Sequence, residues 1–231
     1  MRTAAILPVK SFSQAKQRLG ASVADPLRLD LAKAMVGDVL EVLTSAPELA
    51  LTIVVTREPL AIEIARARGA AVVLDTAEAG QSAAVALGIE RAVAERIERI
   101  LCVPGDCPAL DPSELAELLA APVRGVEAAG EVAIVPDRHG TGTNGLLLRP
   151  PTAIAPSFGP GSCERHRELA AAAGVPCRIE RPSSLLLDID TGADLAELRG
   201  RLSGERFHAP RTRRVLGMDG RQAWRASPSA A

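Results

Sequence analysis

Residues 3–19 read TAAILPVKSFSQAKQRL, an apolar run that passes directly into a loop bearing basic side chains. The run from Thr3 to Val9 predicts a buried strand. The loop after it carries Lys10, Lys16 and Arg18, although only three of the chain's 27 basic residues are lysines. Because a lysine ammonium binds phosphate as a compact point charge, this strand and loop predict a site for a triphosphate. The alternative is that the arginine bias is compositional and the early lysines fall here by chance.

Short β-branched runs alternate with longer amphipathic segments along most of the chain. Strands are predicted at residues 3–9, 51–56, 71–74, 100–103, 132–135, 145–148, 177–180 and 185–187. Helices are predicted at residues 26–43, 59–68, 81–99, 112–119, 163–173 and 192–202. This order predicts an α/β fold, with a mostly parallel sheet, helices on both faces and right-handed crossovers. The looser pattern after Gly130 predicts an added, partly antiparallel edge that closes a site.

Prolines and glycines mark several helix ends. Pro26 after Asp25 and Pro112 after Asp111 predict first-turn prolines behind an aspartate N-cap. Gly69 stands where a glycine is expected to end a helix.

The composition limits which kinds of protein this chain can be. The chain has 231 residues, 47% of them hydrophobic and 24% charged, with a net charge of −1, which predicts a single core and no nucleic-acid or membrane partner. No apolar run suits a signal peptide or a membrane span, so we expect a cytoplasmic protein. The cysteines lack the spacing of a zinc site and are expected to be buried in a reducing compartment; they are Cys102, Cys107, Cys163 and Cys177.

The composition changes after Leu202. Residues 203–231 are rich in Arg, Gly, Ser and Pro, and Phe207 and Trp224 are their only large apolar side chains. We therefore predict one folded domain at residues 1–202, followed by a poorly ordered or docking tail at residues 203–231.

Three aspartates are suited to the carboxyl edge of the predicted sheet, where parallel sheets bind ligands. Asp106 follows the fourth strand, and Asp188 and Asp190 follow the apolar run 185–187, two residues apart on an extended chain. Converging carboxylates predict a Mg²⁺ site that is completed by water and phosphate oxygens. The alternatives are a turn residue for Asp106 and a helix N-cap for Asp190.

Two glycine-rich segments predict anion sites. Residues 137–145, DRHGTGTNG, offer threonine hydroxyls and close backbone approach, although a hairpin turn explains them equally well. Residues 157–167, SFGPGSCERHR, bring Ser162 to a helix start as a cap. Arg165, His166 and Arg167 would add positive charge there, which suits an anionic ligand; an ordinary Ser-capped helix with a solvated basic face is the alternative.

Five motifs, in order, resemble the 2-phospho-L-lactate/phosphoenolpyruvate guanylyltransferase family of coenzyme F-420 biosynthesis. They are K-x-x-x-x-A-K-x-R-L from Lys10, G-D-x-P-A-L from Gly105, D-R-x-G-T-G-T-N from Asp137, F-G-x-x-S-x-x-x-H from Phe158 and L-D-I-D-T-x-x-D-L from Leu187. The resemblance spans about residues 3–202. It implies a single-domain, Rossmann-like nucleotidyltransferase fold of the nucleotide-diphospho-sugar transferase type.

The resemblance also implies a reaction. Phosphoenolpyruvate, or 2-phospho-L-lactate, attacks the α-phosphorus of GTP and releases pyrophosphate; with phosphoenolpyruvate the product is enolpyruvoyl-2-diphospho-5′-guanosine. The implied phosphoenolpyruvate-binding residues are Thr143, Gly159 and Ser162, the Mg²⁺ ligands are Asp106, Asp188 and Asp190, and the catalytic residues are Lys16 and Asp106. The implied nucleotide-binding residues are Lys10, Lys16, Arg18, Gly80 and Ser82. One departure concerns Gly80-Gln81-Ser82, since related members often have Gly-Leu-Asn there.

Other functions stay open at this point. Among enzymes, the alternatives are transfer of CMP to an alcohol phosphate or of GMP to molybdopterin; the latter usually needs a glycine-rich loop that residues 11–15 lack. The non-enzyme alternative is a nucleotide-binding regulatory protein, which retention of the three aspartates disfavours. A homodimer is compatible with the sequence.

Overall fold

The computed structural model describes residues 1–13, 19, 24–121, 130–204 and 207–218. Lys16 and Arg18 of the predicted phosphate loop, and Trp224 of the tail, lie outside this part. The strands are β1 (Thr3–Pro8), β2 (Leu51–Thr56), β3 (Ala71–Leu74), β4 (Arg99–Cys102), β5 (Glu131–Pro136), β6 (Thr143–Arg149) and β7 (Cys177–Ile179). The helices are α1 (Asp25–Ser45), α2 (Pro59–Ala67), α3 (Gln81–Ala94), α4 (Pro112–Ala120), α5 (Ser162–Ala172), α6 (Gly192–Leu202) and α7 (Pro210–Val215).

The strands form one seven-stranded sheet in the order β3-β2-β1-β4-β6-β5-β7. All neighbouring strands are parallel except where β6 pairs with β4 and β5. The predicted α/β fold with a mostly parallel sheet is confirmed, and the antiparallel strand lies inside the sheet rather than at its margin. The predicted strand at 185–187 is wrong, because Leu185 ends a turn and the two residues after it join no strand. The carbonyl of Leu185 instead accepts hydrogen bonds from the side chains of Asn144 and Cys107.

Helix ends agree with the predictions in part. Asp111 caps α4 by accepting from the amides of Ser113 and Glu114, and Gly69 has a φ of +72° after α2, as expected. Asp25 does not cap α1; it is the first helical residue and the N-cap is Ala24. The helix predicted to reach residue 99 ends at Ala94, since Arg96 adopts a φ of +56° and the chain turns into β4.

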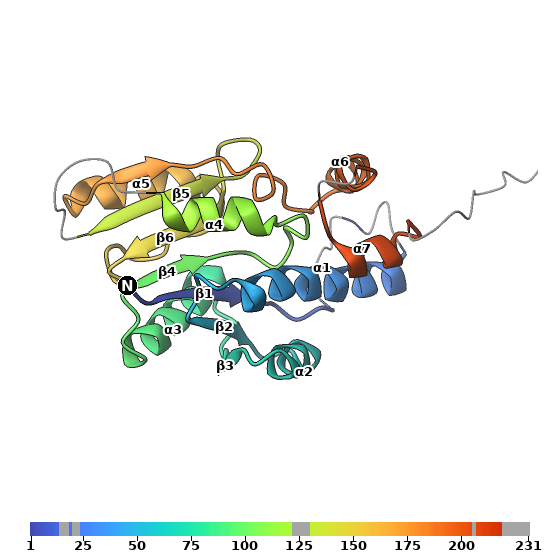
Figure 1. Cartoon of the computed structure of the whole chain (residues 1–231), viewed down its shortest axis with the longest axis horizontal. Coiled ribbons are helices and arrows are strands. Elements are labelled where there is room, and N and C mark those ends of the chain that lie inside the picture. Colours follow the sequence, from blue (N-terminus) through green and yellow to red (C-terminus); the bar gives the residue numbers. More distant parts are fainter. Residues whose placement is uncertain (14–18, 20–23, 122–129, 205–206, 219–231) are drawn as a thin grey trace, which may run out of the picture.

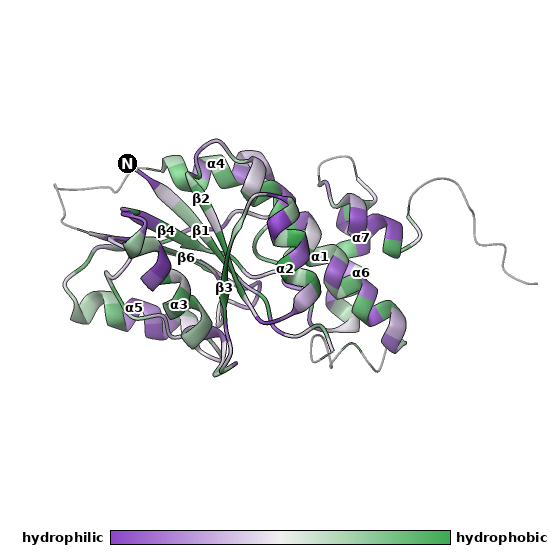
Figure 2. Cartoon of the chain, turned by 90° about the horizontal axis from the view of Figure 1, so that it is seen from below, coloured by the Kyte–Doolittle hydropathy of each residue, from purple (hydrophilic) through white to green (hydrophobic). Residues whose placement is uncertain are grey.

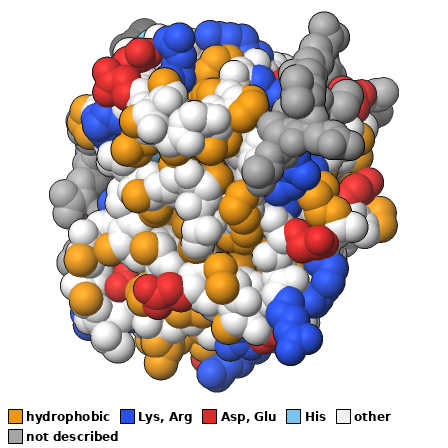
Figure 3. All heavy atoms as spheres, turned by 90° about the vertical axis from the view of Figure 1, so that its left-hand side faces the viewer, with side chains coloured by type: hydrophobic (Ala, Val, Ile, Leu, Met, Phe, Trp, Pro, Cys, Tyr) orange, Lys and Arg blue, Asp and Glu red, His pale blue; other side chains and the backbone are white. Residues whose placement is uncertain are grey.

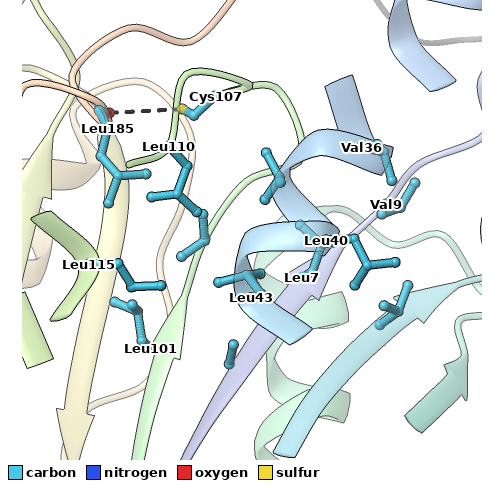
Figure 4. Packing of buried hydrophobic residues seen from close by; sticks show 14 of the residues in the cluster. Leu7, Val9, Val36, Leu40, Leu43, Leu101, Cys107, Leu110, Leu115 and Leu185 are labelled. Atoms are coloured by element: carbon cyan, nitrogen blue, oxygen red, sulfur yellow. Dashed lines mark hydrogen bonds between the residues drawn. The ribbon is translucent and has the colours of Figure 1, made fainter. Parts of the chain in front are cut away.

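Helices cover both faces of the sheet (Figure 1). Alternate residues of β1 point to opposite faces, so Leu7 packs in a core with α1, α2 and α4, and Ile6 packs in a core with α3 and α5. The strands are accordingly mostly apolar in Figure 2, whereas the helices mix apolar and polar residues. Figure 4 shows the first core, with Leu40 and Leu43 of α1 packed beside Leu7.

The segment after α6 is folded in its described part, which agrees with the docking rather than the poorly ordered alternative for the tail. Residues 210–215 form α7, which packs with α1 and α6 in a third core (Figure 1). Asp38 of α1, which is 2% exposed, accepts from the amides of Arg211 and Thr212 at 3.1 and 2.8 Å. The buried carboxylate thus satisfies the first amides of α7, and the order of this segment depends on a contact that its own composition does not reveal.

Three further findings concern the surface, the helices and the cysteines. On the face at the amino end of β1, basic and acidic side chains are interspersed among apolar and neutral ones (Figure 3). Among the described residues, no helix combines the length and hydrophobicity needed to cross a membrane. Cys102, Cys107 and Cys163 are buried as predicted, but Cys177 is exposed on the edge strand β7.

Candidate active site

A cavity of about 470 Å³ opens at the carboxyl ends of the parallel strands. Two groups of residues line its opposite sides. We call the first the β3 side; its lining residues are Lys10, Arg57, Asp75, Glu78 and Gly80. We call the second the β6 side; its lining residues are Thr143, Asn144, Asp188 and Asp190. Asp106, after β4, also lines the cavity, and β4 lies between the strands of the two sides. This is the edge where open parallel sheets bind ligands.

Asp106 reaches the cavity because its backbone passes close to α1. A Cβ at Gly105 would lie 2.8 Å from Cγ2 of Val36, so a residue without a side chain is needed there. The carbonyl of Asp106 accepts from the amide of Ile189 at 3.1 Å. This bond places Asp106 beside the segment that carries Asp188.

The carboxylates repel one another in this setting. Burial, followed by the charge of Asp106, raises the pKa of Asp188, and Asp190 adds to the effect. Asn144 opposes it: its Nδ2 donates to Oδ1 of Asp188 at 3.2 Å and to the carbonyl of Leu185 at 2.9 Å. Asn144 therefore fixes the orientation of Asp188, which is a role that the sequence analysis missed.

A buried histidine organises the β6 side. His166, on the first turns of α5, is fully buried, and its Nδ1 lies 3.1 Å from Oγ1 of Thr143. The amide of Ser157 donates to its Nε2 at 2.9 Å, and Phe158 packs edge-to-face with the ring. Burial, and then repulsion by Arg165, lower the pKa of His166 to about 4, so the ring is neutral near pH 7.

The loop from Ser157 to Gly161 is held at several points. The guanidinium of Arg165 donates to the side chain and the carbonyl of Ser157, and the amide of Phe158 donates to Oγ of Ser82 at 2.8 Å. Gly161 has a φ of +73° and is the N-cap of α5, a conformation that suits glycine. The loop is thereby fixed to both α3 and α5.

The β3 side is built mainly from loops. Asp75 directly follows β3, is 8% exposed, and its Oδ1 accepts from the amide of Glu78 at 2.9 Å. This bond holds Glu78 at a φ of 45°, and its carboxylate pairs with Arg57 at 3.2 Å. Two carboxylates and the exposed Lys10 thus face the cavity from this side.

Comparison with known proteins identifies the family. A family model described as "Guanylyl transferase CofC like" matches residues 3–225. The chain belongs to this family of guanylyl transferases. The resemblance predicted from the motifs is confirmed, and so is an enzyme of the nucleotidyltransferase class.

Two curated relatives and one solved structure illustrate the similarity. The chain is 44% identical to the phosphoenolpyruvate guanylyltransferase of Conexibacter woesei, covering 94% of this chain and 96% of the relative. It is 39% identical to the enzyme of the same name from Sphaerobacter thermophilus, covering 91% and 95%. A structure from Desulfovibrio desulfuricans, described as a nucleotide-diphospho-sugar transferase, superposes with a TM-score of 0.67 at 15% identity, covering 94% and 99%. At that identity the structural likeness supports the fold alone, and it confirms the predicted fold type.

The predicted site residues of this guanylyl transferase are only partly brought together. Six of them line the cavity: Lys10, Gly80, Asp106, Thr143, Asp188 and Asp190. Gly159, Ser162 and Ser82 do not line it but belong to, or contact, the loop at residues 157–161. Lys16 and Arg18 lie outside the described residues, so their roles stay predictions.

Three local interpretations of the sequence are corrected. Ser162 is not the N-cap of α5; it is the first helical residue, is buried, and donates its amide to the carbonyl of Gly159 at 3.0 Å. His166 does not add positive charge, because burial keeps its ring neutral. Asp190 does not cap α6, since Thr191 and Asp194 form the capping box there.

The carboxylates of Asp106, Asp188 and Asp190 offer the kind of ligand atom that Mg²⁺ prefers. Among the described His, Cys, Asp and Glu residues, no three gather into a self-sufficient metal cluster. Mg²⁺ suits this donor set, because it commonly takes one or two carboxylates and completes its octahedron with water and phosphate oxygens. The raised pKa of Asp188 favours a cation, since a bound positive charge would relieve the repulsion from Asp106.

Asp75, Glu78 and Asn144 line the cavity but were not predicted. Asp75 directly follows β3, and Asp106 lies in the loop after β4, so the same signal, an aspartate after an apolar run, could have found Asp75. Asn144 stands directly after Thr143 in the motif D-R-x-G-T-G-T-N. Glu78 has no comparable signal, because its place depends on the turn made by Asp75.

Proposed function

We propose that this guanylyl transferase joins phosphoenolpyruvate to the GMP part of GTP, with Mg²⁺, in the biosynthesis of coenzyme F-420. The product would be enolpyruvoyl-2-diphospho-5′-guanosine, with pyrophosphate as the second product. The observation that carries the proposal is a single cavity in which Asp106, Asp188 and Asp190 face both Lys10 and Thr143. The names of the relatives from Conexibacter woesei and Sphaerobacter thermophilus support the acceptor.

The chemistry brings two anions together, so positioning and charge neutralisation dominate. A phosphate oxygen of phosphoenolpyruvate forms a bond to the α-phosphorus of GTP, and the bond from that phosphorus to the bridging oxygen of the β-phosphate breaks. The acceptor oxygen is already ionised near neutral pH, so no general base is needed. Mg²⁺ held by Asp106, Asp188 and Asp190 would screen the two phosphates from each other.

The residues on the two sides of the cavity are assigned to different substrates. The β3 side is assigned to GTP: Lys10 meets the phosphates, and Asp75 and Glu78 offer acceptors for the N1–H and 2-amino donors of guanine. The β6 side is assigned to the acceptor substrate, which Thr143 meets as a hydroxyl donor. Lys16 and Arg18 are expected to stabilise the charge on departing pyrophosphate.

The choice of acceptor depends on shape. Phosphoenolpyruvate and 2-phospho-L-lactate carry the same two anions and differ mainly in planarity at the carbon that bears the phosphate. Because so small a difference seldom gives more than about a hundredfold preference, we expect phosphoenolpyruvate to be preferred and 2-phospho-L-lactate to react measurably.

The test is an assay of pyrophosphate release with purified protein, GTP, Mg²⁺ and each acceptor in parallel, with mass analysis of the product. Replacing GTP by CTP tests the alternative that the enzyme transfers CMP. Replacing GTP by ATP tests whether the enzyme selects guanine over adenine. A higher kcat/KM for 2-phospho-L-lactate would reverse the acceptor assignment. Binding of GTP without any product would favour the regulatory alternative.

A further inference from the structure

His166 makes two hydrogen bonds that together fix where its proton lies. Its Nε2 is 2.9 Å from the amide nitrogen of Ser157, and its Nδ1 is 3.1 Å from Oγ1 of Thr143. A backbone amide can only donate, so Nε2 must be the acceptor and carry no hydrogen. A neutral imidazole has one N–H, which must then be on Nδ1.

The protonation of Nδ1 decides what the Thr143 hydroxyl can do. Nδ1–H donates to Oγ1, so the threonine oxygen accepts from the histidine and its own hydrogen is released for another acceptor. Within the part of the chain that the structure describes, Oγ1 makes no other hydrogen bond, and Thr143 lines the cavity. With the opposite tautomer the hydroxyl would donate to Nδ1 and would turn a lone pair, rather than a hydrogen, toward an anion.

We propose that His166 is a positioning residue: its Nδ1–H tautomer, fixed by the Ser157 amide, holds the Thr143 hydroxyl as a donor to the phosphate or carboxylate of the acceptor substrate. This inference rests on the proposed function for the identity of that substrate. His166 lies behind Thr143 and is fully buried, so it acts on the substrate only through the threonine.

The same bonds connect the position of the loop to this donor. Ser157 begins the loop that carries Gly159 and leads into α5, and its amide is the group that keeps Nε2 unprotonated. Phe158 packs against the ring at a centroid distance of 5.1 Å and limits its rotation. When this loop is in place, the ring has one orientation and one tautomer, and the hydroxyl has one free hydrogen.

The tautomer is measured directly by a long-range ¹H–¹⁵N NMR spectrum of the imidazoles in the ligand-free protein near pH 7. The chain has three histidines, and His166→Phe identifies the signal of interest by removing it. His208→Phe, at an exposed position, is the matched control that leaves this signal unchanged. We expect protonation at Nδ1 alone. Protonation at Nε2, or at both nitrogens, would overturn the proposal.

The effect on the substrate is measured by a double-mutant cycle with His166→Phe, which keeps a planar ring, and Thr143→Val, which keeps the branched shape of the side chain. Each change should raise the KM for phosphoenolpyruvate by about 10–100-fold, the scale of a lost hydrogen bond to a charged group, with the KM for GTP nearly unchanged. The double variant should be no worse than the worse single variant, because both changes remove the same donor. His166→Asn keeps an amide donor near the Nδ1 position and should recover part of the loss.

The outcomes separate this proposal from a structural role and from the proposed function. Additive effects in the cycle, or an equal rise in the KM for GTP, would show that His166 only supports the fold. Thermal unfolding and circular dichroism of each variant identify misfolding, and in that case the NMR result on the wild-type protein decides. No product from wild-type protein with either acceptor would contradict the proposed function, whereas an Nδ1–H signal would still support the positioning role.

Discussion

The two sides of the cavity are built in different ways. On the β6 side, Thr143, Asn144 and His166 are at most 7% exposed and are oriented by hydrogen bonds, of which only the bond from Asn144 to Asp188 involves a charged group. On the β3 side, Lys10 and Arg57 are exposed and the pair between Arg57 and Glu78 lies near the surface. Neutral buried bonds fix direction, whereas exposed charges attract at longer range and are screened by salt. A small acceptor needs one fixed orientation, and a long triphosphate needs compensation of its charge.

Asp106 is the residue whose loss should break both sides at once. Asp106→Asn should lower turnover by about a thousandfold, because several kcal/mol of charge stabilisation depend on a Mg²⁺ ligand next to both substrates. The measurement is the rate of pyrophosphate release at several Mg²⁺ concentrations, with Asp30→Asn on the exposed face of α1 as the control. Near-normal turnover at limiting Mg²⁺ would remove Asp106 from the site.

Lys16 tests the phosphate loop that the sequence predicts. Lys16→Ala should slow pyrophosphate release by about a hundredfold, the scale of one electrostatic donor to a developing oxyanion. Lys16→Arg should recover only part, because a planar fork does not replace a point charge. Lys33→Ala, the third lysine of the chain, is the control. Full activity in Lys16→Ala would show that the early lysines are there by chance.

The sequence predicted the frame of this site better than its details. β2 (Leu51–Thr56) was predictable because a buried parallel strand is a short apolar run between turn signals. Asp106 was predictable because it lies in the loop that follows such a run, β4. The order of β6 inside the sheet was not predictable, since pairing depends on contacts between distant segments.

The chemical state of a side chain was harder still to predict. His166 stands between two arginines, and its neighbours in sequence suggested a positive charge. Its charge is decided instead by burial against Phe158 and Thr143, which only the tertiary structure brings to it. In the same way, the order of α7 depends on Asp38, which precedes it by more than 170 residues.

Asp75 is the exception on the β3 side, because its side chain is buried, and its substitution tests whether this side recognises the base. Asp75→Asn keeps an oxygen that can accept from the Glu78 amide, so the turn should survive. The substitution replaces one carboxylate oxygen, a hydrogen-bond acceptor for guanine, by an NH₂ donor. The ratio of kcat/KM for GTP to kcat/KM for ATP should therefore fall by about tenfold. Glu63→Gln, on the exposed part of α2, is the control. An unchanged preference would assign base recognition to other groups.

Asp188 should show the cost of a buried carboxylate on the β6 side. Because its folded-state pKa is raised by burial and by Asp106, ionisation of Asp188 destabilises the folded protein at pH values above that pKa. Without Mg²⁺ near neutral pH, Asp188→Asn should therefore raise the Tm, by about 2–4 °C for each kcal/mol of relieved repulsion, while turnover is lost. The gain should disappear as the pH falls through the raised pKa, where wild-type Asp188 is protonated too.

Added Mg²⁺ should raise the Tm of the wild type and leave that of Asp188→Asn nearly unchanged, because only the wild type has the full set of carboxylates that a cation would stabilise. A lower Tm for the variant at all pH values would mean that Asp188 supports the fold rather than carrying a charge for function.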